Sequence, residues 1–240
     1  MLSSLPHFLR WPLVSAVATA GHYDLISGQR IRRDLPCVKL GSDYGGWTVP
    51  TGWLTRDDIC YCAGVGEDIT FDLGLIGAFG CHVYAIDPTP RAVEHVRKNA
   101  QDQPNFHFEQ VGLWNEDTTQ RFYAPANPKH VSHSVMNLQK TGTYFEAECV
   151  RVSTLLARNG HENISLLKLD IEGAEYKVLD SLLEDGIRPK ILCIEFDEAY
   201  HPLDAHFIKR IRSQVARLVS AGYSAAALES RCNYTFVLER

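Results

Sequence analysis

The sequence predicts an α/β protein with a Rossmann-like fold: a mostly parallel sheet with helices on both faces and a C-terminal antiparallel hairpin. From Asp58 onward, short apolar runs alternate with amphipathic stretches, as expected when helices cross over between parallel strands. A glycine pair directly follows the first of these runs, where open α/β sheets bind nucleotide-like ligands. With 240 residues, 45% of them hydrophobic and 22% charged, the chain can form one large domain.

The expected elements follow from hydrophobic periodicity and from glycines at element ends. We expect the two strands of the hairpin at 223–228 and 234–238. Short apolar runs predict further strands at 59–63, 82–86, 106–111, 166–169 and 191–196. Helical spacing predicts helices at 70–79, 91–99, 175–183 and 207–219.

Three segments have different expected roles. Residues 1–57 contain a glycine cluster and predict an N-terminal extension that packs on the core, and residues 58–240 predict the ligand-binding domain. Within it, residues 115–150 form a long irregular excursion, with a hairpin expected near 146–150. Excursions of this length often act as substrate lids.

The bulk charge and the cysteines limit the function classes. A formal net charge of -5 disfavours nucleic acid as a partner. Seven cysteines without CxxC pairs predict reduced, mostly buried thiols and a cytoplasmic protein. The apolar run at 11–20 is too short to cross a bilayer. It predicts a packed helix, with a secretory signal as the alternative.

The loop after the first strand suits a positively charged ligand. Gly64 and Gly66 let the backbone approach a ligand closely. The third small residue of a dinucleotide fingerprint is replaced by Ile69, and the carboxylates of Glu67 and Asp68 would repel a pyrophosphate. S-adenosylmethionine (SAM) carries a sulfonium and an ammonium and no phosphate, so the loop favours SAM. The alternative is that the acidic pair only caps the next helix.

Asp87 ends the second strand and can accept hydrogen bonds from both hydroxyls of an adenosine ribose. This role suits NAD and SAM alike. We expect Val65 and Pro88 to complete the cofactor contacts. The alternative is an Asx turn between Asp87 and Pro88.

A second acidic group follows the strand at 166–169. Asp170 leaves the sheet at its carboxyl end, so Asp170 and Glu172 should face the cofactor crevice, while Glu175 orients the turn or caps the next helix. Glu195, at the end of the following strand, should approach from the neighbouring position. Burying so many carboxylates is costly, which indicates a functional role.

The segments LKLDIEGAEYKVL, CAGVGED and AIDPTP together resemble the FkbM family of SAM-dependent methyltransferases, over roughly residues 58–197. The resemblance implies the seven-stranded class I methyltransferase fold, with SAM at Gly64, Gly66 and Asp87, and O-methylation as the reaction. The sequence departs from the family at Cys62, where an acidic residue usually opens the glycine motif, and at the GED that follows. Glu67 or Asp68 could take over the ammonium contact.

Methyl transfer requires alignment of the acceptor oxygen and removal of its proton. The candidate bases are Asp170, which we favour, Glu172 and His133 from the excursion. In a variant, Asp170 and Glu195 hold Mg²⁺, which would orient and acidify the hydroxyl.

The expected acceptor is a hydroxyl on a sugar, a glycan or a natural product. Two other functions stay open at this point: an NAD-dependent oxidoreductase, and a methyltransferase-like domain that binds without catalysis. The sequence predicts no oligomeric state.

Overall fold

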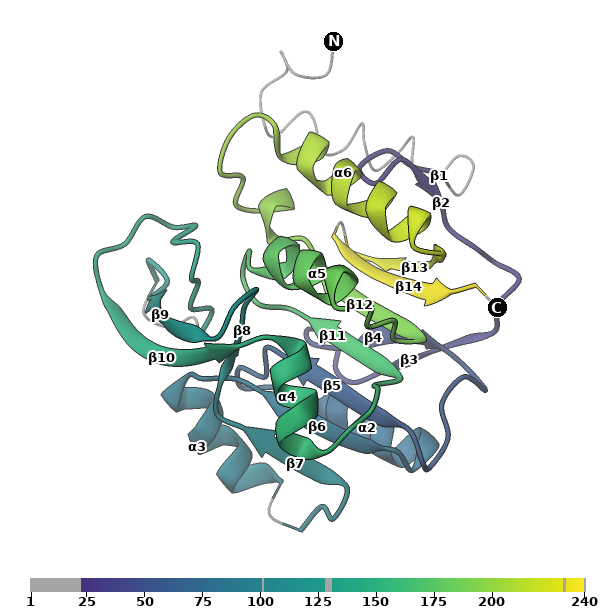
Figure 1. Cartoon of the computed structure of the whole chain (residues 1–240), viewed down its shortest axis with the longest axis horizontal. Coiled ribbons are helices and arrows are strands. Elements are labelled where there is room, and N and C mark those ends of the chain that lie inside the picture. The colour runs from purple at the N-terminus through teal and green to yellow at the C-terminus, as the bar shows by residue number, and fades with distance from the viewer. Residues whose placement is uncertain (1–22, 101, 128–130, 231, 240) are drawn as a thin grey trace.

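The computed structural model describes residues 23–100, 102–127, 131–230 and 232–239 (Figure 1). The segment at 11–20 lies outside the described residues. The helices are α2 (Thr70–Phe79), α3 (Pro90–Asn99), α4 (Val152–Asn159), α5 (Glu175–Glu184) and α6 (Phe207–Ser220), with a 3₁₀ turn η2 (Asp197–Ala199). The strands are β1 (Tyr23–Asp24), β2 (Gln29–Arg30), β3 (Cys37–Leu40), β4 (Trp47–Pro50), β5 (Ile59–Ala63), β6 (His82–Ile86), β7 (Phe106–Glu109), β8 (Gly112–Leu113), β9 (Thr118–Tyr123), β10 (Tyr144–Val150), β11 (Leu166–Leu169), β12 (Ile191–Glu195), β13 (Tyr223–Glu229) and β14 (Asn233–Leu238).

The central sheet has seven strands in the order β13-β14-β12-β11-β5-β6-β7. The five strands from β12 to β7 are mutually parallel, and β14 runs antiparallel to both β12 and β13. The predicted fold class, a mostly parallel seven-stranded Rossmann-like sheet with a C-terminal antiparallel hairpin, is confirmed.

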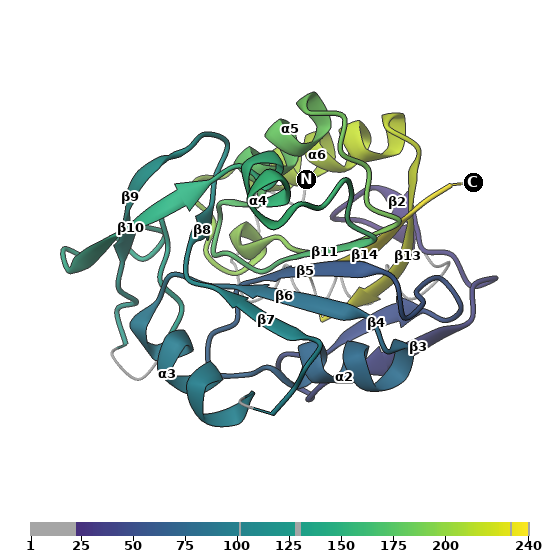
Figure 2. The ribbon, with the colours of Figure 1, turned by 60° about the horizontal axis from the view of Figure 1, so that its bottom comes forward.

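Helices cover both faces of the sheet (Figure 2). The helices α4, α5 and α6 lie on one face, and α2 and α3 lie on the other. The strands β11 and β12 are buried along nearly their whole length, which explains why they are continuous apolar runs in the sequence.

Most predicted elements start and end within one or two residues of their expected bounds. The strand expected at 106–111 ends earlier, at Glu109, because the Val111 amide bonds back to the Glu109 carbonyl at 2.9 Å in a tight turn. Helix α4 was not predicted. It has eight residues, buries Val152, Leu155 and Leu156, and ends at Gly160 with a φ of 69°.

The N-terminal segment packs on the sheet through the hairpin β3-β4. Trp47 and Val49 are buried against α2 residues such as Phe71. The Thr235 hydroxyl of β14 donates to the Thr48 carbonyl at 2.7 Å. The hairpin is therefore joined to both the helix layer and the C-terminal strands.

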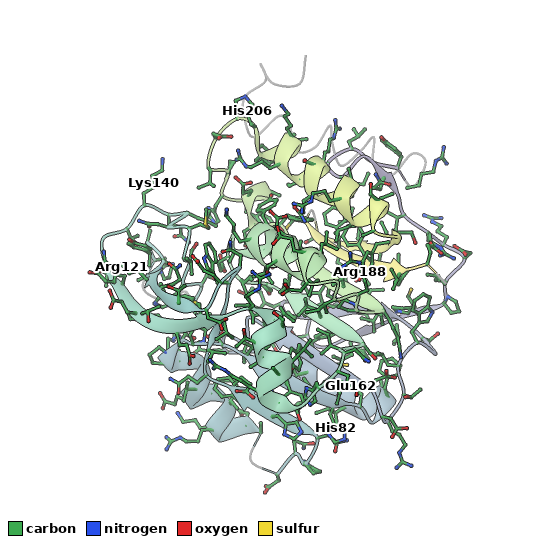
Figure 3. All side chains as sticks on the ribbon, viewed as in Figure 1. His82, Arg121, Lys140, Glu162, Arg188 and His206 are labelled. Atoms are coloured by element: carbon green, nitrogen blue, oxygen red, sulfur yellow. The ribbon has the colours of Figure 1, made fainter. Side chains whose placement is uncertain are left out.

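The excursion contributes β9 and β10 to a small second sheet, in which they join β8 just before it in the order β8-β10-β9, at one side of the molecule (Figure 1). The hairpin expected near 146–150 is not formed by those residues alone: they belong to the single strand β10, which runs antiparallel to β9 at Thr118–Tyr123 across a long connection. Arg121 and Lys140, both on this excursion, lie on the side opposite Arg188, which precedes β12 (Figure 3). The excursion is thus at the carboxyl ends of the parallel strands.

Six of the seven cysteines are buried and Cys37 is exposed, all as free thiols, as predicted. Among the described residues, no helix is both long and apolar enough to cross a membrane.

Candidate functional site

A cleft of about 480 Å³ opens at the carboxyl ends of the parallel strands. This volume lies within the range of small-molecule sites. The cleft brings together all the predicted site residues: Gly64, Val65, Gly66, Glu67, Asp68, Asp87, Pro88, His133, Asp170, Glu172 and Glu195.

Asp87 shapes the glycine loop. Its Oδ2 accepts hydrogen bonds from the Val65 and Gly66 amides at 3.0 and 2.9 Å, and its Oδ1 accepts from the amide and hydroxyl of Thr89 at 2.7 and 2.6 Å. The Thr89 amide bond closes the Asx turn that was the alternative to a cofactor role. Because a carboxylate has about four acceptor positions, all of them are engaged within the protein.

Gly64 is required for packing rather than only for ligand approach. Its φ is 86°, and a Cβ at this position would lie 1.7 Å from the Asp170 carbonyl oxygen. Only glycine fits, because the loop after β5 and the strand end after β11 touch through their backbones. This contact fixes the distance between the glycine loop and the Asp170 segment.

The two loop carboxylates have different partners. Glu67 Oε2 forms an exposed ion pair with Arg91 at 2.7 Å. Asp68 accepts from the Thr70 amide at 2.9 Å and from the Ser42 hydroxyl at 2.5 Å. Partial burial opposes its charge, but these hydrogen bonds lower the pKa of Asp68. The helix-start interaction that we considered as an alternative is therefore present, and Asp68 also anchors the N-terminal extension.

Glu175 organises the turn after β11. It is fully buried, and its Oε1 accepts from the Ile171 and Gly173 amides at 3.0 and 3.1 Å. Burial raises the pKa of Glu175 to about 8. The turn holds Glu172 at a φ of 56°, a conformation uncommon for a non-glycine residue. Of the two roles expected for Glu175, the structure shows the first, orientation of the turn.

Asp170, Glu172, Glu195 and Asp197 form an acidic cluster at the cleft. Burial first, then the charge of Asp170, raises the pKa of Glu195 to about 9, and a protonated Glu195 donates a hydrogen bond to Asp170. Burial raises the pKa of Glu172 to about 7, and burial together with neighbouring carboxylates holds that of Asp197 well above its usual range. The cluster therefore retains protons near neutral pH.

Lys168 is a buried cation in the middle of β11. Its Nζ donates to the Gly64 carbonyl at 2.6 Å and lies 3.5 Å from Asp170 Oδ2. Burial opposes its charge, but the nearby carboxylates, led by Asp170 and Asp72, outweigh burial and raise the pKa of Lys168. The ammonium therefore links the glycine loop to the Asp170 segment.

His133 lines the cleft from the excursion. Its Nδ1 lies 2.9 Å from the Val131 carbonyl, and its ring packs edge-on against Phe145 at 5.3 Å between centroids. The next residue, Ser134, donates to the Glu172 carbonyl at 2.6 Å. The excursion is thus attached directly to the turn that carries Glu172.

Among the described residues, no group of three or more histidine, cysteine or acidic side chains has the geometry of a metal site. The adjacent pair Asp170 and Glu195 is held together by a carboxyl hydrogen bond. The structure thus gives no support to the predicted magnesium variant.

Residues 58–225 match the family described as the methyltransferase FkbM domain. The chain belongs to this family. It is 26% identical over 148 residues to a probable methyltransferase-like protein 24 of Rattus norvegicus, a match that covers 61% of this chain and 34% of the relative. The chain thus spans about a third of the length of that relative.

Solved structures with a similar fold are distant in sequence. A fibrillarin/Nop5p complex superimposes with a TM-score of 0.45 at 10% identity, covering 78% of this chain and 75% of the other. A putative caffeoyl-CoA O-methyltransferase from Staphylococcus aureus has a TM-score of 0.44 at 8% identity, with 76% of each chain covered.

Two buried charged residues were missed in the sequence: Lys168, which lines the cleft, and Asp72, which lies beneath it on α2. Lys168 is a single charge inside an apolar strand, a recognisable signal of a buried ion pair. Asp72 is a carboxylate on the buried face of α2, beside Cys62, where the family usually has an acid in the strand. Burial raises the pKa of Asp72 to about 6.

Proposed function

We propose that this chain is a SAM-dependent methyltransferase that transfers a methyl group to a hydroxyl of a sugar, glycan or natural-product acceptor. The observation that carries the proposal is the shared cleft: the acidic glycine loop and the Asp170 segment open into the same space and are joined through Lys168. The family assignment supports methyl transfer, and the residues around the loop favour SAM over a phosphate-containing cofactor.

The residues present fit SAM in charge. Glu67, Asp68 and Asp87 line the loop side of the cleft, and Asp68 keeps its negative charge through its hydrogen bonds. Such a lining disfavours a pyrophosphate and suits a ligand with sulfonium and ammonium groups. Ribose hydroxyls bound at Asp87 would donate to the same carboxylate oxygens as the loop amides. Asp87 would therefore contribute to cofactor affinity in two ways, by contacting the ribose and by holding the loop in shape.

Bound SAM supplies a methyl group that is already activated by its sulfonium. The chain has to align the acceptor oxygen and take its proton as the carbon–oxygen bond forms and the carbon–sulfur bond breaks. We assign the proton acceptor to Asp170, which is part-exposed to the cleft and next to the Lys168 ammonium. Protonated Glu195 positions Asp170 by donating its carboxyl hydrogen bond to it.

Calorimetric titration with SAM, S-adenosylhomocysteine (SAH) and NAD tests the cofactor, with transfer from methyl-labelled SAM as the readout of activity. We expect the first two to bind and NAD not to bind. Asp87→Asn should weaken SAM binding by about tenfold or more, because each lost charge-assisted hydrogen bond is worth ~1.5 kcal/mol or more. The matched control is Asp57→Asn at an exposed position.

Binding of NAD alone would favour the oxidoreductase alternative. Binding of SAM without transfer to any hydroxyl acceptor would favour a non-catalytic binding domain.

A further inference from the structure

One side of the cleft is built by two segments with residues outside the family-matched range 58–225. We call them together the outer wall. They are the loop region of the β3-β4 hairpin and the turn between β13 and β14, which contribute the lining residues Lys39, Asp43, Tyr44, Glu229, Ser230 and Asn233. A wall built from residues outside the family-matched range, beside the proposed cofactor site, is positioned to select the acceptor.

The outer wall is held in place by its own contacts. Lys39 Nζ pairs with Glu229 Oε2 at 3.2 Å, which joins the two segments. The Ser42 hydroxyl donates to Asp68 at 2.5 Å, which joins the first segment to the glycine loop. Asn233 pairs with Glu195 in the sheet register, which joins the second segment to the acidic cluster. The wall is therefore fixed relative to both halves of the site.

Two tyrosines present aromatic surface at the cleft. Tyr44, in the glycine-rich loop of the outer wall, is 85% exposed, and Tyr200, three residues after Asp197, is 41% exposed. Both rings line the cleft, and partial desolvation, followed by the charges of Asp170 and Glu172, raises the pKa of the Tyr44 hydroxyl. Exposed aromatic rings with polar tips are typical of binding sites for amphipathic ligands.

Asp197 adds a buried carboxyl group to this side of the cleft. The residue is 5% exposed and lines the cleft, and burial, together with the charges of neighbouring carboxylates, holds its pKa well above the usual range. The cleft therefore presents protonated carboxyls, which can donate hydrogen bonds, beside charged carboxylates, which accept them. Sugar hydroxyl groups both donate and accept, so they can pair with both kinds of group.

We propose that the outer wall, with Tyr200 and Asp197, binds the acceptor as a neutral or amino-bearing sugar ring and excludes phosphorylated and carboxylated sugars. This inference rests on the proposed methyltransferase function. The apolar face of a sugar ring packs against tyrosine, and its hydroxyls donate to the carboxylates. Among the described lining residues, nine are acidic. Even without Glu172, Glu195 and Asp197, which retain protons near neutral pH, six carboxylates face two lysines, and both lysines are paired with a carboxylate, so an anionic sugar meets repulsion.

The test is binding of four sugars to the SAH-loaded chain by saturation-transfer NMR: methyl glucoside, methyl glucosaminide, methyl glucuronide and glucose 6-phosphate. We expect the first two to bind at least about tenfold more tightly than the last two, a difference of ~1.4 kcal/mol. Tyr44→Ala should weaken sugar binding by about fivefold or more, while Tyr44→Phe keeps most of it because the ring remains.

The matched control is Tyr144→Ala, which removes another exposed tyrosine, on β10, that does not line the cleft. Each variant is checked for an unchanged SAH affinity and melting temperature, so that a folding defect is recognised. Equal binding of anionic sugars, equal effects of Tyr44→Ala and Tyr144→Ala, or binding of SAH without any of the four sugars would overturn the proposal. If the wild-type chain binds neither SAM nor SAH, the proposed function itself fails.

Discussion

Replacement of Lys168 by methionine tests whether this buried cation holds the site together. Methionine has a similar length and leaves no large cavity, so the main losses are electrostatic. The hydrogen bond from Nζ to the Gly64 carbonyl is charge-assisted and worth ~1.5–3 kcal/mol. The pair with Asp170 adds less than ~1 kcal/mol, because the Asp170 side chain is 28% exposed and its charge is screened.

The expected net loss is ~1.5–3 kcal/mol, because removal of a buried ammonium also removes its desolvation cost. For a chain of this size, that lowers the melting temperature by roughly 3–12 °C, measured by differential scanning calorimetry. We also expect SAM affinity to fall by about tenfold, because the glycine loop loses the hydrogen bond from Lys168 to the Gly64 carbonyl.

Two further variants make the Lys168 result interpretable. Lys98→Met breaks an exposed pair with Glu94 on α3 and should cost less than ~0.5 kcal/mol. The double variant Lys168→Met/Asp72→Asn should recover part of the stability, because Asp72 is a buried carboxylate that Lys168 stabilises. A Lys168→Met protein as stable as the Lys98→Met protein, with wild-type SAM affinity, would refute this reasoning.

Two other predictions concern stability. Gly64→Ala should abolish the folded state or lower the melting temperature by more than ~10 °C, because its Cβ would clash with the Asp170 carbonyl. The control is Gly77→Ala in α2, where an added Cβ meets no atom within 4 Å, so this variant should be neutral or stabilised by ~0.5–1 kcal/mol. Similar melting temperatures for the two variants would argue against the packing role of Gly64. The melting temperature should also fall as the pH rises from about 5 to about 9. In the folded chain Glu172, Glu175 and Glu195 keep protons that the unfolded chain releases above about pH 4.3, so a rise in pH favours unfolding. The fall should be steepest below about pH 7, where all three groups contribute. Glu195→Gln should raise the melting temperature at pH 8.5 and leave it nearly unchanged at pH 5, and a wild-type pH dependence in this variant would contradict the assignment.

The sequence predicted the central fold well because its signals are local. The strand at 166–169 is a buried apolar run that ends in acids, and the helix at 70–79 ends at Gly80, so both bounds were exact. The hairpin β3-β4 was not predicted as strands, because its short segments acquire their pairing only by packing on α2 and β14. Helix α4 was missed because eight residues give little more than two turns of periodicity.

The candidate site was predicted as a set of residues but not as a set of interactions. Asp87, Asp170 and Glu195 were placed at one edge by the parallel-sheet rule, and the structure brings them to one cleft. The contact between Lys168 and the Gly64 carbonyl spans 104 positions in the chain, and no local pattern encodes it. No local pattern encodes the two amide hydrogen bonds to Asp87 either. They form only because the loop after β5 folds back toward the end of β6.

The pH dependence of methyl transfer can separate the two remaining carboxylate bases. Burial raises the pKa of Glu172 to about 7, whereas Asp170 has the Lys168 ammonium beside it. If Glu172 accepted the proton, kcat would rise with pH through about 7, because only the ionised fraction is active. With Asp170 as the base, we expect Glu172→Gln to keep the wild-type pH profile, while Asp170→Asn loses about a hundredfold or more in kcat. A wild-type rise through pH 7 that disappears in Glu172→Gln would transfer the role from Asp170 to Glu172.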